Sequence, residues 1–125
     1  MERAKKAVEY NQGRNNCCQS VLLAYEDRLN MTEEELCALG AAFGAGMGCM
    51  EATCGALCGA QMALGMLKYD GRPVGAEART ILKEFTERAG ASICKELKGI
   101  ETGRVLCSCD NCVKHAVEIL EEHLR

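Results

Sequence analysis

The chain has 125 residues, enough for a hydrophobic core without disulfide support, and we predict a single domain over residues 1–125. Hydrophobic residues make up 48% of it and aromatic residues only 4%, so the core must use aliphatic, Met, Ala and Cys side chains. The formal net charge is −3, and Lys and Arg are scattered among acidic residues. This pattern excludes the basic surface that nucleic-acid binding requires.

The start of the chain does not resemble a targeting segment. The residues MERAKKAVEYNQ are charged from the second position onward and precede no apolar run, so we predict no secretory signal. The longest stretch of low charge, residues 36–67, is interrupted by Glu51, Gln61 and several glycines, which argues against a membrane span. We therefore expect a cytoplasmic protein.

Two helices are predicted at the beginning of the chain. Residues 4–10 have helical spacing, and Asn15 or Asn16 can cap a second helix that continues to Leu29. This second helix has an apolar stripe made of Cys18, Val21, Leu22, Tyr25 and Leu29. Cys17 lies about 100° away from the stripe at the helical pitch. Cys18 is therefore the better candidate for an internal site.

A third helix should begin at Thr32, because Thr32 and Glu35 have the spacing of a capping box. We expect it to end at Gly44, where the glycine-rich sequence GAGMG disfavours a helix.

The fourth predicted helix, residues 54–67 with Thr53 as its cap, is apolar on nearly every face. Such a helix belongs in the centre of a bundle. Its small residues recur one turn apart, at Gly55, Gly59 and Ala63, so a neighbouring helix can approach closely.

The rest of the chain predicts a turn and further helices. Residues 68–75, KYDGRPVG, contain the only Pro and form a connector. Helices are expected over residues 76–88, in a short segment capped by Ser92, and over residues 109–124. No alternating strand pattern persists. We predict an all-α bundle of five to six helices around a buried, Gly/Ala/Cys-rich central helix.

Ten Cys residues are the outstanding feature of the composition. In a reducing cytosol, metal ligation or thiol catalysis is the better interpretation, while structural disulfides remain an alternative for an organism with an oxidising interior. Cys54 and Cys58 lie one turn apart on the central helix, and Cys54 falls in its first turn, where the helix dipole lowers the pKa of a thiol. These two residues are the catalytic candidates if the chemistry is thiol–disulfide exchange.

A second group of thiols, CSCDNC at residues 107–112, precedes the last helix. Cys109 and Cys112 form a CxxC at a helix start, a spacing that can close a disulfide or ligate a metal. The chain lacks the second CxxC of a zinc ribbon and the CxxCxxCxxxCP of bacterial ferredoxins. The motif alone leaves the chemistry open.

In combination, these residues resemble the C-GCAxxG-C-C family of redox-active proteins. The resemblance rests on NCCQSVL at residues 16–22, CGALCG at residues 54–59, Cys94 before ELKG, and Cys112 before the final helix. It implies four family cysteines, which correspond to Cys18 (with Cys17 less favoured), Cys54, Cys94 and Cys112. A related domain in split-Soret cytochromes is associated with an iron–sulfur cluster, so the resemblance implies that these four thiols bind such a cluster. The additional thiols Cys17, Cys49, Cys58, Cys107 and Cys109 are secondary candidates for ligands.

We therefore expect a redox-active protein with a cysteine-ligated iron–sulfur cluster that transfers electrons to or from a redox partner protein. A thiol–disulfide oxidoreductase or redox sensor, using Cys54 with Cys58 or Cys109 with Cys112, is the alternative. A structural zinc site in a protein-interaction domain is a further one. A homodimer is left open.

Overall fold

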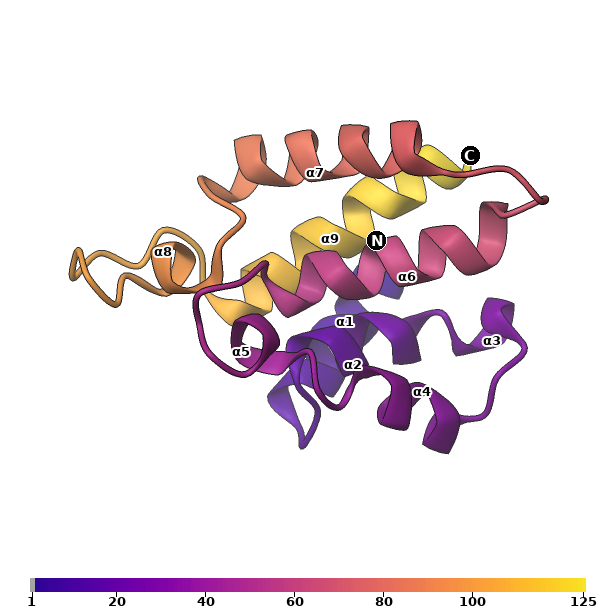
Figure 1. Cartoon of the computed structure of the whole chain (residues 1–125). Helices are drawn as coiled ribbons and strands as arrows, with labels where there is room; N and C mark the ends of the chain where they lie inside the picture. Colours follow the sequence, from indigo (N-terminus) through magenta and orange to yellow (C-terminus); the bar gives the residue numbers. More distant parts are fainter. Residues whose placement is uncertain (1) are drawn as a thin grey trace.

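The fold, described for residues 2–125 of a computed structural model, is all-α, as the sequence predicts (Figure 1). It contains nine helical segments in these residues, where five to six helices were expected. Three of the segments, α3, α5 and α8, are only four or five residues long. The full order is α1 (Glu2–Gln12), α2 (Cys17–Ala24), α3 (Glu26–Leu29), α4 (Glu33–Gly40), α5 (Gly44–Met47), α6 (Gly55–Lys68), α7 (Gly75–Ala89), α8 (Cys94–Lys98) and α9 (Cys109–Leu124).

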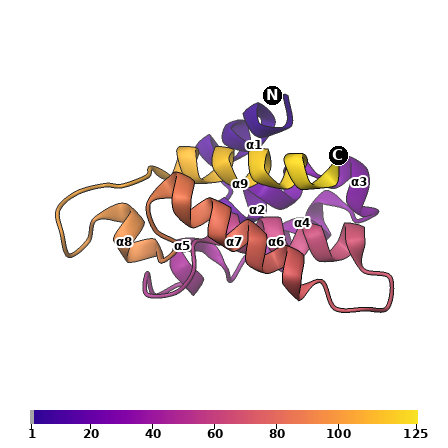
Figure 2. The same ribbon diagram turned by 90° about the horizontal axis from the view of Figure 1, so that it is seen from above.

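Helix α6 lies at the centre, between α2 on one side and α7 and α9 on the other (Figures 1 and 2). Its inner residues are almost all small or aliphatic and buried: Gly55, Ala56, Leu57, Gly59, Ala60, Ala63 and Leu64. A Cβ added at Gly59 would lie 2.9 Å from the carbonyl oxygen of Cys18 and 3.0 Å from the Cβ of Val21. The predicted close approach is therefore confirmed, and the helix that makes it is α2.

Two predicted helix starts are confirmed in atomic detail. Asn16 caps α2, where its side chain accepts a hydrogen bond from the Gln19 N–H and the Gln19 side chain accepts one from the Asn16 N–H. Thr32 and Glu35 form the same reciprocal arrangement at the start of α4. The predicted helix to Leu29 is interrupted, however, because the backbone leaves the helical conformation at Tyr25.

The glycine-rich loop differs from its prediction. Helix α4 ends at Gly40, earlier than the expected Gly44, and a run of left-handed residues follows around α5. Their φ angles are 51° at Ala45, 59° at Gly46, 61° at Met47 and 83° at Gly48. This coiled backbone ends in an isolated β-bridge between Thr53 and Ile93. Thr53 and Ser92 are therefore not the helix caps that the sequence indicated; the cap positions are Cys54 and Ile93.

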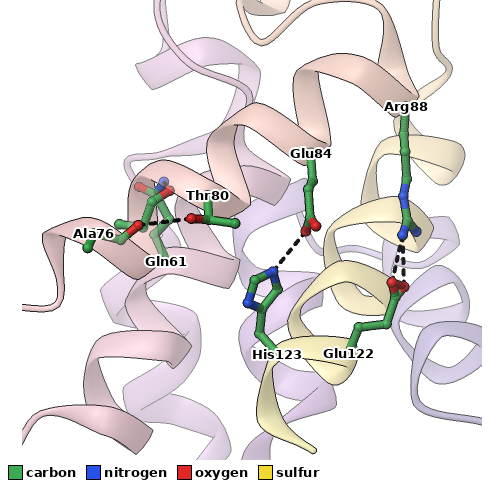
Figure 3. Close-up of polar contacts among 8 residues, drawn as sticks. Gln61, Ala76, Thr80, Glu84, Arg88, Glu122 and His123 are labelled. Atoms are coloured by element: carbon green, nitrogen blue, oxygen red, sulfur yellow. Dashed lines mark hydrogen bonds and ion pairs between the residues drawn. The ribbon is translucent and has the colours of Figure 1, made fainter.

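Helix α7 is attached to its neighbours by apolar packing below and by polar contacts at its edge (Figure 3). Arg88 donates to the Glu122 carboxylate at 2.7 Å, and Glu84 pairs with His123 at 2.8 Å. Gln61 of α6 donates to the carbonyl of Ala78 at 3.2 Å.

Arg3 forms a polar network at the start of α1. Arg3 pairs with Asp27 and Glu121, donates to the carbonyl oxygen of Ala24 at 2.6 Å, and lies over the ring of Tyr25. This network joins the start of the chain to α2, α3 and α9. No helix within residues 2–125 combines the length and the apolar character needed to cross a membrane.

Candidate functional site

A cavity of about 370 Å³ lies at the end of the bundle where α2, α6, α8 and α9 begin. Figures 1 and 2 place α5 and α8 at this end, beside the start of α9. The wall contains four thiols and one amine: Cys17, Cys54, Cys94, Cys109 and Lys98. Asn11, Asn15, Asn16, Ala45, Met50 and Gly55 complete it.

Each of the four cavity thiols stands at a helix start. Cys17, Cys94 and Cys109 are the first residues of α2, α8 and α9, and Cys54 is the N-cap residue of α6. Helix starts carry unpaired N–H groups and a partial positive charge, which favour a thiolate over a thiol. The fold therefore gathers sulfur at positions suited to negative charge.

Side-chain contacts hold the start of α9 against the last turn of α1. Asp110 accepts hydrogen bonds from Asn11 at 2.7 Å and from Gln12 at 3.1 Å. Ser108 caps α9 by accepting from the N–H of Asn111 at 3.1 Å. Cys109 and Cys17 line the same cavity although the two are far apart in sequence.

Backbone pairing brings the other two thiols together. The Cys54 N–H donates to the carbonyl of Ser92 at 2.8 Å, and the Cys94 N–H donates to the carbonyl of Ala52 at 3.0 Å. Gly46 closes over this pairing, since a Cβ there would lie 2.6 Å from the Cβ of Cys94. A residue without a side chain is thus required beside Cys94.

Two pairs of thiols shift each other's pKa values. In the first pair, a hydrogen bond with Cys17 lowers the pKa of Cys109, and Lys98 lowers it further, against the effect of burial. The same hydrogen bond, together with burial, raises the pKa of Cys17. In this pair, a negative charge is therefore favoured at Cys109 over Cys17.

The second pair joins Cys54 to the buried Cys112. Their hydrogen bond lowers the pKa of Cys54 despite burial, and the N–H groups of Ala56 and Leu57 at the start of α6 lower it further. The pKa of Cys112 is raised by the same hydrogen bond and by burial. In this pair, a negative charge is therefore favoured at Cys54 over Cys112.

Lys98 supplies a positive charge to both pairs. Its Nζ donates to the carbonyl of Cys107 at 3.2 Å and lies 3.7 Å from the Sγ of Cys112. Burial opposes the charge on this amine, but Cys112, Cys109 and Cys54 outweigh that effect and raise the pKa of Lys98. A half-buried ammonium is thereby kept among the thiols.

The structure places the four expected ligands in two environments. Cys54 and Cys94 line the cavity, whereas Cys18 and Cys112 do not. Cys18 is fully buried with its Sγ 3.9 Å from the Sδ of Met62, and burial followed by the proximity of Cys58 raises its pKa to about 12. The secondary candidates Cys17 and Cys109 occupy the cavity wall in their place.

The remaining thiols lie outside the wall. Cys58 is half-buried and 3.9 Å from the carbonyl of Thr53, Cys49 is exposed, and Cys107 is buried next to Cys112. Disulfide exchange by Cys54 with Cys58, or by Cys109 with Cys112, stays a prediction. Within residues 2–125, no three His, Cys, Asp or Glu side chains are preassembled to hold a single metal ion. The four cavity thiols line a cavity and are not arranged around a single ion site.

Sequence reasoning did not identify Lys98 as part of the site, and it favoured Cys18 over Cys17. A stripe of apolar residues identifies the side of a helix that faces the core, and Cys18 does face the core. A different feature of the sequence indicates the cavity thiols: each of them stands at or next to a helix start that the sequence itself predicts.

A protein-family model described as "Putative redox-active protein (C_GCAxxG_C_C)" matches residues 15–123 of the chain. The match includes all four cavity thiols and Lys98. The searches of curated proteins and of solved structures gave no match. The chain belongs to the C_GCAxxG_C_C family of redox-active proteins.

Proposed function

We propose that this redox-active protein transfers electrons through an iron–sulfur cluster held by Cys17, Cys54, Cys94 and Cys109. The observation that supports the proposal is the convergence of four thiols, each at a helix start, on one cavity. The proposed set keeps Cys54 and Cys94 from the sequence analysis. It replaces Cys18 and Cys112, which lie outside the cavity wall, by their neighbours Cys17 and Cys109.

The donor set fits such a group chemically. Iron–sulfur clusters are commonly held by four cysteine thiolates, which leave the assembly with a net negative charge. The helix starts and the Lys98 ammonium would offset that charge, because both present positive potential to the cavity. A bound cluster would supply one-electron redox chemistry.

Residues next to the ligand thiols would tune the reduction potential of the cluster. The N–H groups of Ala56 and Leu57 donate hydrogen bonds to the sulfur of Cys54. Hydrogen bonds to ligand sulfur are a principal control of cluster reduction potential. Met50 and Ala45 add apolar side chains to the cavity wall. Cys109 is exposed, so a redox partner protein would exchange electrons at this side of the cavity.

The test is purification of the full chain without oxygen, followed by visible absorption spectroscopy and iron and sulfide analysis. We expect a coloured protein with stoichiometric iron and sulfide. Colourless, iron-free protein after an attempted cluster reconstitution would contradict the proposal. Stoichiometric zinc whose removal unfolds the chain, with no redox change, would instead support a structural zinc site.

Neighbouring cysteines provide matched variants for the ligand assignment. Cys17→Ser and Cys109→Ser should lose most of the bound iron, because serine is a poor substitute for a thiolate ligand. Cys18→Ser should retain it, although it lies one residue away, because the Cys18 side chain contacts Met62 in the core. Loss of iron in Cys18→Ser with retention in Cys17→Ser would reverse the assignment.

A further inference from the structure

Cys18 and Met62 bring two sulfur atoms together between α2 and α6. The Sγ of Cys18 lies 3.9 Å from the Sδ of Met62. Neither residue belongs to the wall of the cavity described above. Metal–sulfur bonds are about 2.3 Å long, so two sulfurs that bind one ion in a trigonal site lie about 4 Å apart. The two sulfur atoms therefore already have the spacing of ligands that share an ion.

Cys58 adds a third sulfur atom on the same side of α6. Gly55, Cys58 and Met62 are spaced by three and four residues, so they share one face of this helix. This face is turned toward Cys18, because a Cβ added at Gly55 would lie 3.3 Å from the Cys18 nitrogen and Met62 contacts its sulfur. Cys58 stands between these two positions along the helix.

The position of Cys18 is fixed by glycines on two sides. A Cβ at Gly59 would lie 2.9 Å from the carbonyl oxygen of Cys18, and a Cβ at Gly40 would lie 3.3 Å from its Sγ. Larger residues would press on this thiol. Cys18 is also the second residue of α2, and Cys58 is the fourth residue of α6. The partial positive charge of both helix starts would offset the negative charge of two bound thiolates.

The donor set and its access indicate a soft ion of low coordination number. Cys58 and Met62 are only partly buried, so an ion can reach the fully buried Cys18 from their side of α6. Zinc in structural sites takes four ligands. Thiolates and thioethers are ligands that select Cu(I), and Cu(I) accepts as few as three of them. Two thiols and one thioether therefore suit Cu(I) better than zinc.

We infer that Cys18, Cys58 and Met62 bind one Cu(I) ion. This site is separate from the proposed iron–sulfur cluster and does not depend on it. Binding involves no electron transfer, because the ion enters and stays as Cu(I). Each of the two thiols releases its proton to the solvent when its sulfur binds the ion, and the thioether binds without a change in protonation.

The experiment uses the full chain, reduced under argon, with carbon-13 in the methyl groups of its Met residues. Cu(I) is added as its acetonitrile complex. Met62 reports on the inferred site, whereas Met50, whose Sδ is 3.8 Å from the Sγ of Cys94, reports on the cavity. We expect the Met62 methyl signal to shift as one ion per chain binds there. A Met62 signal that stays in place after two equivalents of Cu(I), with or without a shift of Met50, would overturn the inference.

Matched variants test the individual ligands. Cys58→Ser should weaken the binding that shifts the Met62 signal by about tenfold or more, measured by competition with the chelator bicinchoninate. Cys49→Ser removes an exposed thiol instead and should leave that binding unchanged. Met62→Leu should lower the copper retained per chain by one ion. Met66→Leu, one turn further along α6 and 55% exposed, should not. Equal effects within either pair of variants would contradict the assigned ligands.

Iron and sulfide are measured on the same preparations before copper is added. Cys58→Ser and Met62→Leu should retain the iron of the unaltered chain, because neither residue lines the cavity. A Met62 shift in iron-free protein would contradict the proposed cluster and support the Cu(I) site. Bound cluster without a Met62 shift would do the reverse. Circular dichroism checks the fold of each variant, and the Met62 signal of the unaltered chain tests the inference without any variant.

Discussion

The centre of the bundle and its cavity end use the same helices in different ways. In the centre, side chains from the faces of α6, α7 and α9 pack together, and Leu57, Phe85 and Val117 are completely buried. At the cavity end, the residues that matter are helix starts and left-handed loop residues. Stability is therefore expected to depend on helix faces, and chemistry on helix ends.

The strongest test of this division removes a large side chain from the core. Phe85→Ala deletes a fully buried ring and should lower the free energy of unfolding by about 3–5 kcal/mol, measured by urea denaturation. Phe85 is not part of the cavity wall, so thiol reactivity of the folded protein should stay the same. A cost below about 1 kcal/mol would show that the core relaxes far more than its packing indicates.

Glycine substitutions compare the two regions directly. Gly46→Ala should cost about 1–3 kcal/mol in unfolding free energy, because φ is 59° and the new Cβ would lie 2.6 Å from the Cβ of Cys94. Gly65→Ala should instead stabilise the protein by about 0.5–1 kcal/mol, since a Cβ there meets no atom and the position is inside α6. Equal effects at the two positions would contradict the assigned role of Gly46.

These expectations show which parts of the molecule its sequence predicts. Helical spacing and capping boxes identified the central helix, the start of α4 at Thr32 and Glu35, and the last helix over residues 109–124. These features are local, because they depend on residues within one or two turns of each other.

The cavity could be predicted only in part, because its assembly depends on contacts between distant segments. Nothing local in the sequence shows that Asp110 binds Asn11, or that Ala52 pairs with Cys94. Apolar periodicity also favoured Cys18 over Cys17, because it identifies the side of a helix that faces the core. It does not show which residues at the start of a helix line a cavity. Weighting cysteines by their distance from predicted caps would have favoured Cys17 and Cys109.

Replacement of Lys98 tests the electrostatics of the cavity end. In the metal-free protein, Lys98→Met should raise the pKa values of Cys54 and Cys109, because the ammonium favours both thiolates. Only the thiolate reacts with iodoacetamide, so the alkylation rate follows the fraction of thiolate. At a pH below the pKa of the unaltered protein, the rate should fall, by about tenfold if the pKa rises by one. At a pH above the pKa of the variant, the rate should stay the same. Alkylation rates measured against pH would show this.

Lys95 offers a matched control on the same short helix. Its Nζ pairs with Glu101 at 3.0 Å and lies outside the cavity wall, so Lys95→Met should leave the alkylation profile unchanged. If both substitutions change the profile alike, net charge and not the position of Lys98 would control the thiols.

The smallest effect is expected at the edge of the core, where Arg88 of α7 pairs with Glu122 of α9 (Figure 3). The pair lowers the pKa of Glu122 and raises that of Arg88, but the two side chains are 36% and 44% exposed. A double-mutant cycle with Arg88→Ala and Glu122→Ala should therefore give a coupling energy of only about 0.2–1 kcal/mol, reduced further by salt. A coupling energy above about 2 kcal/mol would approach the loss of stability expected for Phe85→Ala. Polar contacts at the edge of α7, and not only its buried face, would then hold this helix to the bundle.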